Sequence, residues 1–165
     1  MAKTIQFHGK YKGVIVSKTN ILKIKKTLKD KYNEIAERIA YRMEMIGEEA
    51  VRIAREKGKE NDYHDVTGNL RSSIGYVILI DGNVYKQGKP EQFGGSNGNG
   101  SQGAASAQRL LQSMQTKFPW GVVLIVCAGM KYAAYVESVK HKDVLTSAEL
   151  RAEELANKLL KSYIN

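Results

Sequence analysis

Apolar residues recur at helical spacing from near residue 28 to residue 53. Eight of them are separated by steps of three or four residues, with a mean of about 3.6, the period of an α-helix. They are Leu28, Tyr32, Ile35, Ile39, Met43, Ile46, Ala50 and Ile53. Asn20 is placed to cap the start of this helix and Gly58 to stop it. The pattern predicts a long amphipathic helix over roughly residues 21–57, which is either bent or reaches past its own domain toward a neighbour.

A short polar-to-apolar segment follows, from Val66 to Ile74. Its sequence predicts one helical turn in which Thr67 is the cap, with Leu70 and Ile74 four residues apart on one face. The chain then becomes β-prone. The apolar run 75–80 predicts a strand, the Asp-Gly pair at 81–82 predicts a hairpin turn, and a return strand begins at residue 83.

Glycine, serine and asparagine dominate the chain between residues 86 and 103. This composition is typical of a flexible segment, and it leads into a short amphipathic helix at 104–118. The continuous apolar run from Trp120 to Ala128 predicts a fully buried strand. Residues 86–118 are therefore interpreted as a glycine-rich insertion between two strands of one sheet.

The last third of the chain is predicted to be helical. Residues 130–137 form a short aromatic segment, and Thr146 with Glu149 matches a capping box at the start of a helix over about 147–163. Residues 1–18 predict a basic N-terminal arm or hairpin. We expect a single α+β domain over 1–165, in which a long N-terminal helix and a C-terminal helix pack on an antiparallel sheet of about three to five strands.

The positive charge of the chain is concentrated at its beginning. The formal net charge is +9, and residues 1–31 contribute +8 of it, with nine lysines against one aspartate. Candidate phosphate contacts in this segment are Lys23, Lys25 and Lys26. A lysine-rich segment that is simply solvated explains the same pattern. The sequence has no apolar run long enough for a membrane span and no secretory signal, so we expect a protein that is cytosolic where it is made.

Residues with catalytic chemistry are few and scattered. Glu137 lies four residues before His141, which on a helix would bring a carboxylate to an imidazole, but His8 and His64 offer no second pair. Cys127 lies inside an apolar strand, where a thiol behaves as a small hydrophobic group. The glycine-rich segment lacks the lysine of a phosphate-binding loop. These observations disfavour an enzyme and predict no metal and no cofactor.

Two segments together resemble the bacteriophage tail-completion (neck, or head–tail joining) protein family. The first motif, residues 65–74, is similar to that family's Thr-Gly-Asn-Leu-Arg-x-Ser-Ile signature after the long helix. The second motif, residues 131–137, is similar to its Tyr-Ala-x-Tyr-Val-Glu segment after the last central strand. The matching residues are Thr67, Gly68, Asn69, Leu70, Arg71, Ser73, Ile74, Tyr132, Ala133, Tyr135, Val136 and Glu137. The resemblance runs from about Val14 to the C-terminus, with a gap over the insertion.

The resemblance implies a non-enzymatic virion subunit. Such proteins form a homo-oligomeric ring, commonly of six copies, between the head connector and the tail tube or terminator. The expected location is then the virion, and the host cytoplasm during assembly. A closed ring needs two different surface patches on each subunit. One would include Tyr132, Tyr135 and Val136, unless these side chains fill the core of the monomer instead.

Two alternatives remain open at this stage. A basic nucleic-acid-binding module could use the lysine-rich N-terminal segment, and ring lysines could also make non-specific contact with passing DNA. A hydrolase could instead be centred on Glu137 and His141.

Overall fold

The computed structural model describes residues 20–59 and 65–164, and the chain divides into two compact units between Ile35 and Ala36. The predicted arm at 1–18 lies outside the described residues, as do His8 and His64. Within the described ranges, no helix is long and apolar enough to cross a membrane.

The predicted long helix is helix α1, Ile21–Lys59. Its cap is confirmed, because the Asn20 side-chain oxygen accepts hydrogen bonds from the amides of Leu22 (3.1 Å) and Lys23 (3.3 Å). The helix continues one residue past the predicted stop at Gly58. In the first unit, the large apolar side chains of α1 are between 43% and 72% exposed. They are Ile21, Leu22, Ile24, Leu28, Tyr32 and Ile35.

The second unit is built on a three-stranded antiparallel sheet in the order β2-β1-β3. Strand β1 is Ile74–Ile80, β2 is Asn83–Gln87 and β3 is Val122–Ala128. The hairpin between β1 and β2 turns at residues 81–82, both of which have positive φ (48° and 77°), as a two-residue hairpin turn requires. The predicted fold class, an α+β domain with helices on an antiparallel sheet, is confirmed.

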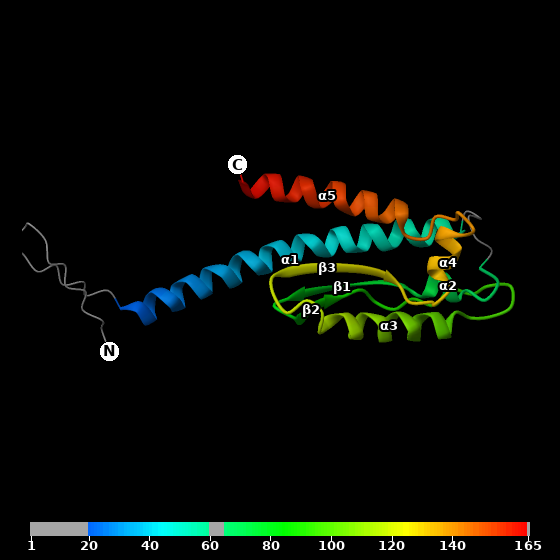
Figure 1. Cartoon of the computed structure of the whole chain (residues 1–165), viewed down its shortest axis with the longest axis horizontal. Coiled ribbons are helices and arrows are strands. Elements are labelled where there is room, and N and C mark those ends of the chain that lie inside the picture. Colours follow the sequence, from blue (N-terminus) through cyan, green and yellow to red (C-terminus); the bar gives the residue numbers. More distant parts are fainter. Residues whose placement is uncertain (1–19, 60–64, 165) are drawn as a thin grey trace, which may run out of the picture. The chain divides into compact units, whose positions relative to one another are not determined.

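Helices cover both faces of this sheet (Figure 1). Side chains alternate along β1, so Tyr76 and Ile78 face the part of α1 after residue 35 and the start of α5, Thr146–Ile164. Val77 and Leu79 face the other way and pack with Leu111 of α3, Ser101–Gln115. The predicted insertion therefore supplies a complete layer of the fold.

Strand β3 differs from its prediction. It begins at Val122, it lies at the edge of the sheet, and Cys127 is its one fully buried residue. Trp120 precedes the strand and is 82% exposed. The apolar run is continuous because both faces of β3 meet helices, but an edge strand has only one neighbouring strand to cover it. The prediction of a fully buried strand over 120–128 is wrong in that respect.

The start of α5 is capped by residues that the sequence pattern did not indicate. The Glu137 carboxylate accepts hydrogen bonds from the amide (2.8 Å) and the hydroxyl (2.6 Å) of Thr146. Asp143 accepts from the amide and hydroxyl of Ser147. The Glu149 amide instead donates to the Leu145 carbonyl at 2.8 Å. The helix lies where the sequence predicts it, but the predicted capping box is wrong, because two earlier carboxylates occupy the free amides.

Candidate functional site

The two motifs meet at one end of the sheet. The first contributes α2, Asn69–Ser72, and the second contributes α4, Ala133–Ser138, and Figure 1 shows these short helices side by side. Leu70 packs with Ala133 and Val144 in one buried cluster. The amide of Gly129, where β3 ends, donates to the Ser73 carbonyl at 2.9 Å. Segments some sixty residues apart in sequence thus form one structural unit.

The start of α2 is held by Asp65. Its carboxylate accepts hydrogen bonds from the amides of Leu70 (3.3 Å) and Arg71 (3.0 Å), which have no partner inside so short a helix. Gly68, with φ of 72°, occupies the cap position, so the prediction that Thr67 is the cap is wrong. Thr67 still accepts from the Asn69 amide at 3.3 Å. Ile74 does not continue the helical face of Leu70 but begins β1, and it packs in a different cluster.

The glycine-rich segment, residues 88–103, packs directly on the first motif. The Asn97 amide donates to the Val66 carbonyl (2.8 Å) and the Gly100 amide to the Thr67 carbonyl (3.0 Å). The Gly103 amide donates to the Asn69 side-chain oxygen at 3.1 Å. The composition predicts a flexible segment, but these bonds give it a defined course.

Glycine is needed at these positions because two stretches of backbone approach closely. A Cβ added at Gly68 would lie 1.7 Å from the Phe93 carbonyl oxygen, and one at Gly95 would lie 2.3 Å from the Val66 carbonyl oxygen. Such distances are far inside van der Waals contact. The glycines of both segments therefore allow the first motif and the glycine-rich segment to lie against each other.

Ser72 is a structural residue that the sequence analysis missed. Its side chain is fully buried, donates to the Gly68 carbonyl (2.6 Å) and accepts from the Phe93 amide (2.8 Å). Ser73, which the motif does include, is equally buried and donates to the Leu70 carbonyl at 2.7 Å. Both serines thus bind backbone, and neither is available to a ligand. No pattern in the sequence distinguishes Ser72 from an exposed serine.

The aromatic residues of the second motif lie on the surface. Tyr132 is 40% exposed and Tyr135 is 50% exposed, whereas Ala133 between them is buried and Val136 is half-buried. The alternative in which the tyrosines fill the core is therefore wrong. Burial of its ring, followed by the charge of Asp65, raises the pKa of Tyr132 despite an opposing hydrogen bond with Thr67. The two motifs are thus in contact through these side chains as well.

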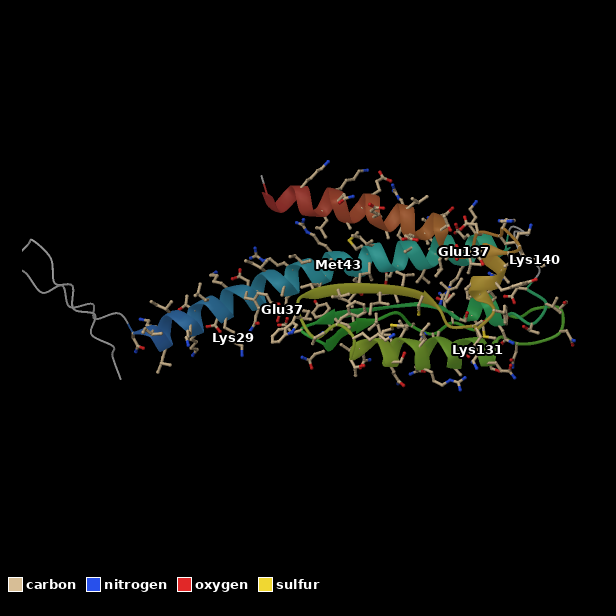
Figure 2. All side chains as sticks on the ribbon, viewed as in Figure 1. Lys29, Glu37, Met43, Lys131, Glu137 and Lys140 are labelled. Atoms are coloured by element: carbon tan, nitrogen blue, oxygen red, sulfur yellow. The ribbon has the colours of Figure 1, made fainter. Side chains whose placement is uncertain are left out.

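Glu137 has a structural partner and does not pair with His141. It lies where the chain leaves α4 toward α5 (Figure 2). Burial acts to raise the pKa of Glu137, but hydrogen bonds from Thr146 and from the amide of Leu145 outweigh it, and the pKa lies below its ordinary value. Helix α4 ends at Ser138, and His141 is exposed with a φ of 51°. The helical spacing on which the hydrolase alternative depended is therefore absent.

The candidate phosphate contacts do not share one face. Lys23, Lys25 and Lys26 are all exposed on α1. At about 100° per residue, Lys25 lies roughly 200° around the helix from Lys23. Lys26, three residues after Lys23, lies about 60° from it, so Lys23 and Lys26 share one face of α1 and Lys25 lies on another.

A charged cavity that the sequence did not indicate lies next to the first motif. Its volume is about 590 Å³, and its lining comes from α1, α2, β1, β2 and the glycine-rich segment. The ring of Phe93 holds two guanidinium groups, that of Arg71 at 4.4 Å and that of Arg55 at 5.2 Å from its centre. Sequence reasoning missed it because Arg55, Arg71 and Phe93 share no local pattern.

Comparisons with known proteins leave the chain without an identified relative. No protein-family model matches it, and no curated protein or solved structure is significantly similar to it. In residues 20–59 and 65–164, no group of three or more histidine, cysteine, aspartate or glutamate side chains is arranged to hold a metal ion.

Proposed function

We propose that this protein is a non-enzymatic structural subunit of a bacteriophage or prophage particle. Copies of it would form a ring at the head–tail junction or tail end, where it serves tail completion and head–tail joining. Its partners are other copies of itself, the head connector, and the tail tube or terminator. Exposed lysines around the start of α1 suit sequence-independent contact with DNA that passes through such a ring.

One observation carries the proposal: the two segments that resemble the family signature fold into a single unit. Leu70 of the first motif and Ala133 of the second share a buried cluster. Several of the motif positions, Asn69 and Glu137 among them, make internal hydrogen bonds, whereas Tyr132 and Tyr135 remain on the surface. This division is what a subunit needs when a rigid end must present an aromatic patch to a neighbour.

The exposed apolar stripe of the first unit adds a second surface. Ile24, Leu28 and Ile35 continue the helical spacing of the buried stripe, yet they are 45–65% exposed. Ring closure by identical subunits requires two different patches that recognise each other. The stripe and the aromatic patch at α4 are two candidates for such patches.

Deletion of the gene from a producing phage or prophage tests the proposal. Electron microscopy should show filled heads separate from finished tails, and the wild-type gene supplied in trans should restore joined particles. Supplying Tyr135→Gln in trans should fail to restore them, while Arg109→Gln, an exposed change on α3, should succeed. Intact, infectious particles from the deletion strain would refute the proposal.

A further inference from the structure

The charged cavity beside the first motif contains cations that the protein itself does not neutralise. Its lining includes Arg55, Arg71, Tyr76, Gly88, Lys89 and Phe93. Other cations around it are already paired: Arg52 binds Glu49 and Glu56, and Lys86 binds Glu44 at 2.8 Å. The question is therefore what balances the charges of Arg71 and Lys89, and whether Glu91 alone suffices for Arg55.

Arg55 is only partly satisfied. Its side chain is 11% exposed, and its guanidinium donates to Glu91 (2.8 Å) and to the Ile74 carbonyl (3.0 Å). Its Nε is buried without a hydrogen-bond acceptor. The single carboxylate that pairs with it, Glu91, is itself 57% exposed. A nearly buried cation thus depends on one partner at the surface.

Arg71 has no acidic partner among the described residues. Its Nε donates to the Arg55 carbonyl at 3.2 Å, and within residues 20–59 and 65–164 the terminal nitrogens of its guanidinium form no hydrogen bond with a carboxylate. Lys89 at the cavity lining is exposed and likewise forms no ion pair in these ranges. Burial lowers the pKa of Arg55, Glu91 partly offsets this, and the charge of Arg71 lowers it further. A second negative charge would relieve this repulsion.

We propose that this cavity binds a carboxylate of an acidic peptide segment on a partner protein. Arg71 would donate both terminal nitrogens to the carboxylate, with Phe93 supporting the guanidinium plane, and Lys89 would add a charge at the opening. The inference deepens the proposed function and rests on it only for the source of the peptide, a neighbouring subunit of the particle.

The surroundings favour a peptide carboxylate over a nucleic-acid backbone. The cavity is concave, and Glu48, Glu56 and Glu91 also line it. A continuous phosphate backbone would bring several negative charges close to these carboxylates, which costs free energy. A single acidic side chain can reach Arg71 without running along them.

The test uses the purified full-length protein labelled with ¹⁵N, in which the arginine Nε–H signals are followed by NMR. Hexaglutamate, hexaglutamine and a short duplex DNA are titrated separately at constant ionic strength. We expect hexaglutamate to shift the Arg71 Nε–H signal saturably and hexaglutamine to leave it unchanged. Arg71→Gln, in which the Arg55 Nε–H signal is followed instead, should weaken hexaglutamate binding by about tenfold or more, the loss typical of one charge-assisted bidentate contact.

Two further variants keep the test decisive. Lys89→Gln changes an exposed residue at the opening, so it tests the site even if Arg71→Gln fails to fold, and it should weaken binding about two- to threefold. Arg109→Gln is the matched control, because Arg109 is exposed on α3 and bonds only within its own helix, and it should bind hexaglutamate as the wild type does. Equal binding by the Lys89 and Arg71 variants and the wild type would overturn the proposal.

Other results would also overturn it. These are a shift of the Arg71 signal by DNA alone, and the absence of saturation with hexaglutamate. The outcome is separable from that of the gene deletion. Hexaglutamate binding at Arg71 together with infectious deletion particles would support the site and refute the ring. No hexaglutamate binding, together with separate heads and tails in the deletion strain, would refute the site and support the ring.

Discussion

Replacing Gly103 by alanine should destabilise the protein, although the same change in most helices stabilises it. Gly103 lies in the first turn of α3, and alanine is favoured over glycine in a helix by up to about 1 kcal/mol. Here the added Cβ would lie 2.0 Å from the Asn69 carbonyl oxygen and 2.7 Å from its carbon. These are backbone atoms, so no side chain can rotate away to make room.

The structure sets the size of the effect. To reach ordinary contact, the Cβ–oxygen distance must grow from 2.0 Å to at least 3.4 Å, so α3 and the first motif must separate. Overpacking of this kind costs about 1–3 kcal/mol, and a backbone obstacle favours the upper end of that range. After the gain in helix propensity is subtracted, we expect a net loss of about 2 kcal/mol, or roughly 4–8 °C in Tm for a chain of this length.

Thermal unfolding followed by circular dichroism measures the change. The matched control is Gly94→Ala in the same glycine-rich segment, because its Cβ would have one neighbour, the Gly98 carbonyl oxygen, at 3.9 Å. That variant should stay within about 0.5 kcal/mol of the wild type. A Gly103→Ala protein with a higher Tm than the wild type would refute the close packing of the glycine-rich segment on the first motif.

Three further predictions concern other parts of the molecule. Glu137→Gln should cost about 1–2 kcal/mol in urea unfolding at neutral pH, because α5 loses a charged cap. The pKa of Glu137 lies below its ordinary value in the folded protein, so the stabilisation that Glu137 gives is present at neutral pH and is lost as the pH falls through that folded-state pKa. The Glu137→Gln variant should lack this part of the acid sensitivity. An unchanged dependence of stability on pH in the variant would contradict the capping role. Burial raises the pKa of the Cys127 thiol to about 11. Iodoacetamide at pH 8 should therefore modify Cys127 at least about a hundredfold more slowly than a free thiol, a rate that mass spectrometry can measure. Rapid labelling of the folded protein would contradict the burial of this thiol in β3. Leu28→Gln should change the free energy of unfolding by less than about 0.5 kcal/mol, because Leu28 is 65% exposed. It should nevertheless reduce complementation of the deletion phage. Full complementation would show that the exposed apolar stripe of the first unit takes no part in the proposed interface.

The elements that follow a local rule were predictable from sequence. The spacing of Met43, Ile46 and Ala50 identifies α1 because a helix repeats every 3.6 residues, and the Asp-Gly pair at 81–82 identifies the hairpin because both positions need positive φ. The two motifs were also found in sequence, although only the structure places Leu70 against Ala133.

The contacts that depend on backbone or on distant segments were not predictable. The glycine-rich segment appears flexible in composition because its partners are carbonyls and amides, which every residue carries, so no side-chain pattern marks them. Arg55, Arg71 and Phe93 come from three separate segments, and nothing in their local sequences pairs them. Glu137 was associated with His141 because both lie at helical spacing, but the helix ends between them.

The packing of the glycine-rich segment on the first motif also has a consequence for the order of folding. The hairpin of β1 and β2 closes locally, whereas the Gly103 amide finds its acceptor on Asn69, 34 residues earlier in the chain. Closing so long a loop costs chain entropy before its contacts compensate, so we expect hairpin amides to gain protection from hydrogen exchange before those of Asn97 and Gly100. A newly made chain would then form its local hairpin first and fix the glycine-rich segment against the first motif last.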